Sequence, residues 1–191
     1  MKGRQRDILE VALALLAEEG YGGLTVRRIA ERVGVTEPAI YRHFSSKDEL
    51  LFCLYDYVWE KMEPLLISAL RSEKGCPERL GAFLGAVFLH LERNRGVNLV
   101  LLSEAIHHNR PCLKEAMGRL WDRVSGVVAV IVEEAKESGA LREDVETEVL
   151  VRAVLGFVQA SVTKSLIKGS PLAGEREVSS FVSVLWEGAA R

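Results

Sequence analysis

The stretch Thr25–Lys47, TVRRIAERVGVTEPAIYRHFSSK, decides the fold of the N-terminal part of this chain. Apolar residues at helical spacing predict two short helices, one before and one after Gly34. The first helix has to end at Gly34, because glycine adopts a positive φ at little cost. Two helices joined by a short turn form a helix-turn-helix, whose second helix enters the DNA major groove. The same pattern also occurs as a plain helical corner.

The outward side chains of the second helix favour the DNA-binding interpretation over a plain corner. They are groups suited to phosphate oxygens and base edges, whereas a solvated helix face is usually richer in Glu and Lys. These positions are Thr36, Glu37, Pro38, Tyr41, Arg42 and His43, and Lys47 follows directly after the helix.

The segment from about Arg6 to Leu51 resembles the DNA-binding domain of the TetR/AcrR family of bacterial transcriptional regulators. The matching pieces are ILEVALALLAEEGYGGLTVRRIAERVGV and TEPAIYRHFSSKDELL, and Tyr41-x-x-Phe44 followed by Lys47 is their most telling part. Farther along, the chain agrees with this family only in length and helical character. The resemblance implies a homodimeric, ligand-responsive transcriptional regulator, with repression as the family default.

The resemblance also assigns roles to the residues of the motif. The residues that it places against the groove are Thr36, Glu37, Pro38, Ala39, Arg42 and His43. Those that it places on phosphates are Thr25, Arg27, Tyr41 and Lys47. A carboxylate such as Glu37 is tolerated near phosphates when it accepts a hydrogen bond from a cytosine amino group. Arg42 suits bidentate binding of guanine, and a simple phosphate contact is an equally good interpretation.

Charge and cysteine content limit the class of protein. The net charge is −2, so the chain as a whole has no positive charge that would attract nucleic acid. DNA affinity therefore depends on where the cations point. The 3 cysteines are far apart and include no C-x-x-C pair, so they suggest neither a disulfide framework nor a zinc site, and they fit a reducing cytosol. No unbroken apolar run reaches the roughly 18 residues of a membrane span, and we expect a cytoplasmic protein without a membrane partner.

Helical stripes of apolar residues continue to the C-terminus, and no strand-like alternation accompanies them. The sequence therefore predicts an all-α protein of about nine helices. We expect a three-helix DNA-binding domain over residues 1–47 and a helical effector-binding and dimerisation domain over residues 48–191.

The last two predicted helices, from Glu146 to Lys168 and from about Val178 onward, carry more apolar surface than one subunit requires. The resemblance implies that they form a four-helix bundle with their copies in a second subunit. The small residues Gly156 and Ala160 would permit close approach there, and they are equally compatible with an internal core. The expected interface residues are Val154, Val158, Val162, Val178, Phe181, Val182, Leu185 and Trp186.

The resemblance further implies that the middle helices enclose a small apolar or aromatic effector. Periodicity alone cannot distinguish a hollow core from a filled one, so plain core packing remains the alternative at each position. The expected lining residues are Phe83, Val87, Phe88, Leu102, Ile106, Met117, Trp121, Phe157 and Ser161. Asn98, Glu104, His107 and Gln159 are candidate polar contacts for the effector.

The sequence offers little support for catalysis. Glu104 and His107 form the Glu-x-x-His unit of di-iron bundles, but no second copy accompanies them. No nucleophile elbow, phosphate loop or dinucleotide fingerprint is present. We therefore expect no metal, no cofactor and no enzymatic activity. The alternatives to the regulator are a helical protein-interaction adaptor and, less favoured, an enzyme with a site in the bundle core.

Overall fold

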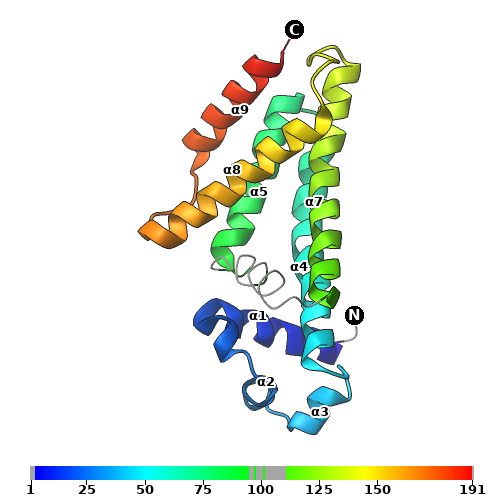
Figure 1. Ribbon diagram of the computed structural model, residues 1–191, viewed down its shortest axis with the longest axis vertical. Coiled ribbons are helices and arrows are strands. Elements are labelled where there is room, and N and C mark those ends of the chain that lie inside the picture. Colours follow the sequence, from blue (N-terminus) through cyan, green and yellow to red (C-terminus); the bar gives the residue numbers. More distant parts are fainter. Residues whose placement is uncertain (1–2, 95–96, 98–100, 102–110, 191) are drawn as a thin grey trace. The chain divides into compact units, whose positions relative to one another are not determined.

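The computed structural model describes residues 3–94, 97, 101 and 111–190, which form eight helices and one isolated β-bridge (Figure 1). The predicted all-α class is confirmed. The number of helices, eight in the described residues against about nine predicted, is a minor difference. Apolar residues from Val97 to His107 also predict a short helix, and most of that segment lies outside the described residues.

The chain packs as two compact units, one made of Met1–Lys61 with Arg93–Trp121 and the other of Met62–Glu92 with Asp122–Arg191. Helices α4 (Lys47–Leu70) and α7 (Pro111–Glu137) each contribute residues to both units. This is a division by packing. The functional boundary predicted after residue 47, between a DNA-binding domain and an effector-binding domain, stays a prediction.

The first unit begins with α1 (Gly3–Gly23), α2 (Val26–Val33) and α3 (Glu37–Tyr41), followed by the first half of α4. The stripe expected on α1 is buried: Ile8, Ala12 and Leu15 are no more than 1% exposed. The helix path breaks at Gly20, whose φ is 69°. Helix α2 packs against both α1 and α3 in this unit.

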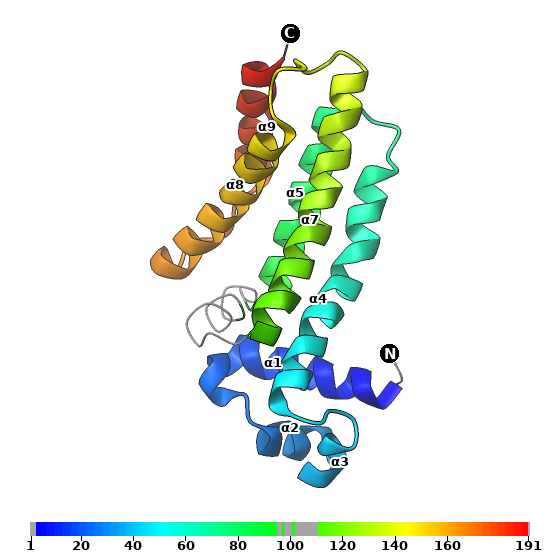
Figure 2. The same ribbon diagram turned by 45° about the vertical axis from the view of Figure 1, so that its right-hand side comes forward.

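The second unit contains α5 (Cys76–Arg93), α8 (Thr147–Lys168) and α9 (Glu175–Ala189), together with parts of α4 and α7. Stacked and edge-on phenylalanine rings join α5, α8 and α9. A backbone hydrogen bond of 3.0 Å from Arg142 N to Ala189 O fastens the end of α9 to the loop after α7. Helices α8 and α9 lie side by side in both ribbon views (Figure 2).

Candidate nucleic-acid interface and effector region

Helix α3 presents its polar side chains outward because its apolar ones anchor it. Ile40 and Phe44 are 1% and 2% exposed, whereas Tyr41 is 50% exposed. Arg42 is also exposed, and His43 is half-buried. Thr36, Glu37 and Pro38 are exposed, and Ala39 is half-buried. The side chains of Tyr41 and Arg42 thus lie where a ligand outside the unit can reach them.

The turn before α3 has the geometry that its sequence predicts. Gly34 adopts φ 75° and ψ 39°, the left-handed conformation in which other residues are strained. The helix after it starts at Glu37, and Pro38 sits in its first turn, where a missing N–H costs nothing. The backbone N–H of Val35 donates to the carbonyl of Ala30 at 2.9 Å, closing the turn. Helices α2 and α3 therefore meet as a helix-turn-helix.

The start of α2 is capped by Thr25, a residue type that favours this position. The hydroxyl of Thr25 accepts a hydrogen bond of 3.2 Å from the backbone N–H of Arg28. Thr25 and Arg27 are both exposed. The guanidinium of Arg27 donates to the carboxylate of Glu31 at 2.9 Å, and this hydrogen bond raises the Arg27 pKa above its ordinary value. Arg27 thus enters any contact with phosphate already ion-paired along its own helix.

Two ion pairs between α1 and α2 were not predicted from the sequence. Arg28 donates to Glu19 through its two terminal guanidinium nitrogens, Nη1 and Nη2, and Arg32 binds Glu18 at 2.7 Å. The hydrogen bond from Arg28 is also the main reason that the Glu19 pKa lies below its ordinary value. Opposite charges in one short segment were visible in the sequence, but the partners were not. The pairing depends on how the end of α1 turns back toward α2.

Lys47, at the first residue of α4, lies with its Nζ 4.1 Å from the centre of the Tyr21 ring. The ring fixes the ammonium group through a cation–π contact. The hydroxyl of Ser46 accepts from the N–H of Glu49 at 3.1 Å, as a capping box requires. The Glu49 carboxylate, however, accepts from the hydroxyl and the N–H of Ser45, one residue earlier than in a standard box, and these bonds lower its pKa.

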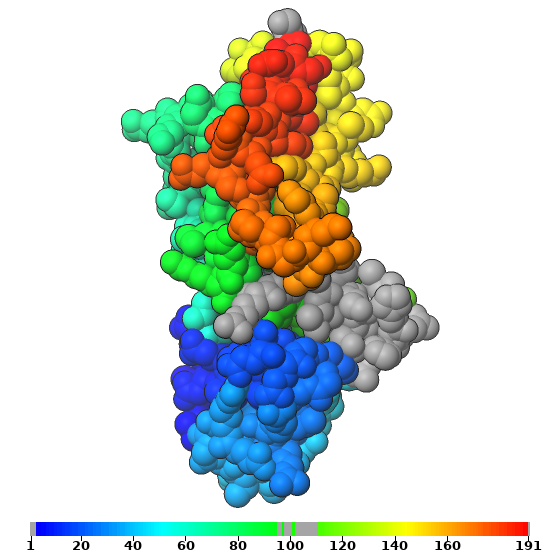
Figure 3. All heavy atoms as spheres, turned by 90° about the vertical axis from the view of Figure 1, so that its left-hand side faces the viewer, coloured from blue at the N-terminus to red at the C-terminus, as the bar shows by residue number. Residues whose placement is uncertain are grey.

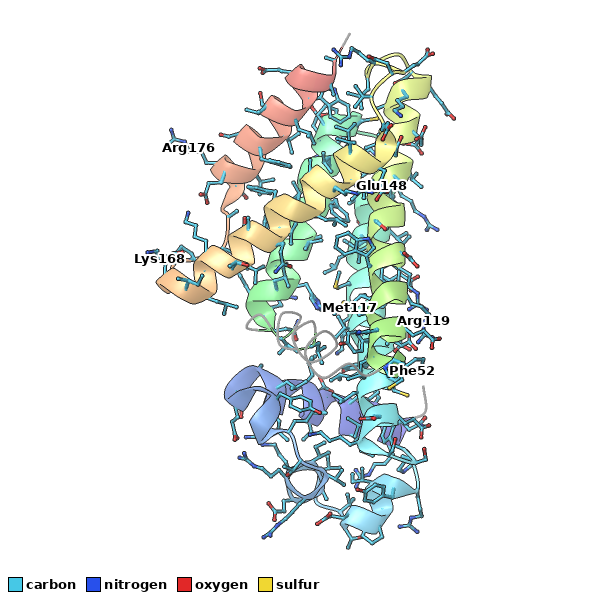
Figure 4. The ribbon with its side chains drawn as sticks, in the orientation of Figure 1. Phe52, Met117, Arg119, Glu148, Lys168 and Arg176 are labelled. Carbon is cyan, nitrogen blue, oxygen red and sulfur yellow. The ribbon has the colours of Figure 1, made fainter. Side chains whose placement is uncertain are left out.

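The first half of α4 is held by side-chain contacts within the same unit. The guanidinium carbon of Arg119 lies 4.1 Å from the centre of the Phe52 ring, and both side chains are labelled in Figure 4. Arg119 also pairs with Asp56 at 3.6 Å. The buried hydroxyl of Tyr55 donates to the carbonyl of Leu101 at 2.8 Å. The start of α7 and residue 101 are thereby fixed to the helix that directly follows α3.

Several of the residues expected to line an effector pocket meet in the second unit. Phe83, Val87 and Phe88 are buried on α5. The ring of Phe157 meets that of Phe88 edge-on at 5.8 Å. The Phe157 ring also stacks on Phe181 at 4.2 Å, which joins a predicted pocket residue to a predicted interface residue.

The other expected pocket residues are placed differently or not at all. The hydroxyl of Ser161 donates to the carbonyl of Phe157 at 2.7 Å, so its polar atom is used within α8. Met117 is half-buried and belongs to the first unit, and Trp121 is 50% exposed. Leu102 and Ile106, and with them Asn98, Glu104 and His107, lie outside the described residues.

An open hollow of about 630 Å³ lies beside the stacked rings of α8 and α9, and no pattern in the sequence predicts it. Its lining mixes aromatic, charged and small polar groups: Phe157, Arg176, Glu177, Ser180, Phe181 and Val184. Figure 4 shows Arg176 near the start of α9 and Lys168 at the end of α8. The predicted pocket residues and this hollow share only Phe157.

The expected interface residues divide into covered and uncovered positions. Val154, Val162, Val178 and Val182 are no more than 6% exposed, so this chain already covers them. Val158, Phe181, Leu185 and Trp186 are half-buried.

The opposite side of α8 is exposed, at Val149, Gly156, Ala160, Thr163 and Ile167. Val149 and Ile167 are 52% and 72% exposed. Gly156 and Ala160 therefore lie on the surface of the subunit, and an internal core does not explain them. Figure 3 shows the end of α8 and the face of α9 open to solvent.

By length and composition, α8 is also the one helix among the described residues that is able to cross a membrane. Its sequence contains no long unbroken apolar run, because Glu148, Arg152 and Lys164 interrupt it. Only 28% of the apolar 18-residue stretch of α8 is buried within the chain. The rest of α8 is half-buried or exposed on the subunit.

The described residues contain no group of three or more His, Cys, Asp or Glu side chains able to hold a metal ion. Cys53, Cys76 and Cys112 are free thiols within these residues. Burial raises the pKa of Cys53 and of Cys76, which lowers the fraction of reactive thiolate.

Residues 8–53 match the family described as bacterial regulatory proteins, tetR family. Among curated proteins, the nucleoid occlusion factor SlmA of Vibrio campbellii is 29% identical over 84% of this chain and 83% of its own length. Among solved structures, FadR from Bacillus subtilis in complex with stearoyl-CoA is similar with a TM-score of 0.80 and 18% identity, covering 95% of this chain and 97% of that one. A TetR transcription regulator from Haloarcula marismortui gives a TM-score of 0.79 at 21% identity, with complete coverage of both chains.

Proposed function

Because this chain belongs to the TetR family of bacterial regulatory proteins, we propose that it is a homodimeric repressor whose palindromic operator is released when a small molecule binds. The family consists of DNA-binding regulators, and the proposed site of action is the cytoplasm. Two recognition helices related by a twofold axis read half-sites one helical turn or a multiple of it apart.

The observation that carries the proposal is the outward presentation of Tyr41 and Arg42 on a helix anchored by Ile40 and Phe44. We assign base contacts to Arg42 and to the exposed first turn of α3. We assign phosphate contacts to Thr25, Arg27, Tyr41 and Lys47. For Lys47, the Tyr21 ring supports this role because a cation that is already oriented loses less rotamer entropy on binding.

We assign the subunit interface to the exposed side of α8 together with α9. On this side Val149, Gly156, Ala160 and Ile167 are apolar or small, with the exposed polar residues Arg152 and Thr163 beside them. Small residues allow two helices to approach closely, and burying this side removes from water the surface that makes α8 so hydropathic. In this proposal the exposed apolar residues of α8 pack against a second copy of the chain.

The proposed effector is a small molecule with an apolar or aromatic body. The phenylalanine rings contributed by α5, α8 and α9 provide the surface for it. Since the similar FadR structure contains stearoyl-CoA, a fatty acyl thioester is the first compound to test. The contacts of Arg119 and Tyr55 supply a route from α7 and residue 101 to α4, and α4 continues directly from the helix-turn-helix.

The test begins with selection of bound fragments from the genomic DNA of the source organism by the purified dimer. The proposal expects a palindromic sequence, and it expects acyl-CoA compounds of increasing chain length, with CoA as the control, to release it. An effector shifts the equilibrium between the DNA-binding and the released state of the dimer only by as much as its affinities for the two states differ. Failure to bind any DNA sequence preferentially contradicts the function, and tighter operator binding with ligand contradicts derepression.

The SlmA relatives favour a second candidate function, a DNA-bound factor in nucleoid occlusion. Their identity to this chain is higher than that of the similar solved structures. The two functions differ in the distribution of binding sites. Mapping the bound sites on the chromosome distinguishes sites confined to promoters, which support the repressor, from sites spread between genes and within them, which support the occlusion factor.

A further inference from the structure

Most of the cations of α1 and α2 are already neutralised within the chain. Arg4 pairs with Asp7 and Arg27 with Glu31, each on its own helix. Arg28 and Arg32 pair with carboxylates of a different helix. Arg42, after α3, makes no ion pair with the described residues. The paired arginines of α1 and α2 therefore have less positive charge to offer DNA than Arg42 has.

The pairs between α1 and α2 form an ordered arrangement, which we call the carboxylate clamp: Glu18, Glu19, Arg28 and Arg32. Arg28 and Arg32 lie four residues apart and so share one face of α2. Glu18 and Glu19 are consecutive at the end of α1, and each takes one arginine. The clamp requires glycine at position 23, because a Cβ there would collide with the side chain of Glu19.

Stability alone gives a weak reason for the clamp. The four side chains are between 33% and 45% exposed, and ion pairs at this exposure contribute little to folding. Their position is more informative. Arg28 lies in the first turn of α2, directly after the exposed Thr25 and Arg27 that we assign to phosphates. Unpaired, both arginines would add to the attraction for any DNA duplex.

We propose that Glu18 and Glu19 act as internal competitors for DNA phosphates and hold down affinity for duplexes of arbitrary sequence. The inference rests on the proposed DNA-binding function. Non-specific binding comes from the release of counterions by protein cations, and each added phosphate contact steepens the dependence of log K on log salt by about 0.9. A cation that already faces a carboxylate releases fewer counterions from DNA. The preference for the operator over other DNA sequences then depends on the contacts made by α3.

The test is the variant Glu18→Gln/Glu19→Gln, measured by fluorescence anisotropy on a 30-base-pair duplex of scrambled sequence across a range of salt concentrations. Non-specific affinity should rise several-fold, and the salt slope should steepen by about 1–2. The matched control is Glu63→Gln/Glu73→Gln, which changes the net charge equally at exposed residues of α4 and the loop after it. An unchanged slope, or an equal effect in the control, overturns the inference.

A second variant keeps the inference testable if the first fails to fold. Arg28→Gln/Arg32→Gln removes cations that the clamp already neutralises, so it should weaken binding to the scrambled duplex less than about twofold. A tenfold loss would show that these arginines reach phosphate despite the clamp and would overturn the inference. If the wild-type protein binds no DNA, the proposed function fails as well. If it binds its selected operator while the clamp variants behave like wild type, only this inference fails.

Discussion

Helices α3 and α8 both expose a face to solvent, but the two faces have opposite chemistry. Helix α3 is a short helix of 5 residues, and it presents Tyr41 and Arg42 next to a compact core. Helix α8 has 22 residues and presents Val149, Gly156 and Ile167. A charged, hydrated partner such as DNA suits the first face, whereas a dry protein surface suits the second. Exposure alone therefore does not identify a binding site, and the chemistry of the exposed side chains decides which partner fits.

The largest expected effect is at the apolar face. Gly156→Glu places a carboxylate in the proposed interface of each subunit, and burying an unpaired charge costs several kcal/mol. The dimer dissociation constant should therefore rise by roughly a hundredfold or more. Operator affinity should fall with it, because a monomer reads only one half-site. Analytical ultracentrifugation and operator titration measure both quantities.

Gly126→Glu is the matched control for this change. Gly126 is also an exposed residue inside a long helix with no atom near its missing Cβ. Glutamate is a better helix former than glycine by roughly 0.5–1 kcal/mol, so neither variant should be less stable as a subunit. If both variants remain dimeric, the exposed side of α8 is not the interface.

The second effect is at the polar face. Replacing Arg42 with alanine should cost about 1–3 kcal/mol of discrimination at one base pair if the guanidinium binds guanine bidentately. Selection from a randomised operator library measures the preference at each position. Arg27→Ala is the comparison, and it should weaken all sequences alike. If Arg42→Ala also weakens all sequences alike and reduces the salt slope by about 0.9, Arg42 is a phosphate contact.

Local features of the first face were predictable from the sequence because they depend on neighbouring residues. The Thr25 cap, the turn at Gly34 and the buried Ile40 all follow from spacing and residue type. The ion pair between Arg32 and Glu18 was not predictable, because it spans 14 residues and depends on the path of the chain between α1 and α2.

The second face was harder to predict for a different reason. Helix α8 is apolar on more than one side, and periodicity cannot tell which side its own subunit covers. Val154 and Val162 were expected at the interface, yet both are buried within the chain. The side that contains Gly156 and Ala160 is the exposed one. Only the packing of α5, α8 and α9 distinguishes them.

A smaller effect concerns the contact that joins α7 to α4. Arg119→Met removes a cation–π contact and the ion pair with Asp56, which together should lower the free energy of unfolding by about 1 kcal/mol. Arg119→Lys keeps the charge but loses the planar stacking on Phe52, and it should recover part of that loss. Urea unfolding measures both variants. Identical midpoints for wild type and Arg119→Met would show that the contact does not stabilise the first unit.

The smallest effect is a loss of thermal stability at acidic pH, caused by two carboxylates in the unit that contains α3. Hydrogen bonds from Arg28 and Ser45 lower the folded-state pKa of Glu19 and Glu49 below the ordinary 4.5. Both carboxylates therefore stabilise the fold fully above the unfolded-state pKa. Their contribution is lost as the pH falls through the lowered, folded-state pKa. Wild type should accordingly lose slightly more thermal stability than Glu19→Gln/Glu49→Gln between neutral pH and about pH 3.5. The two melting curves should approach each other in acid, and a constant difference in Tm across this range would contradict the assignment.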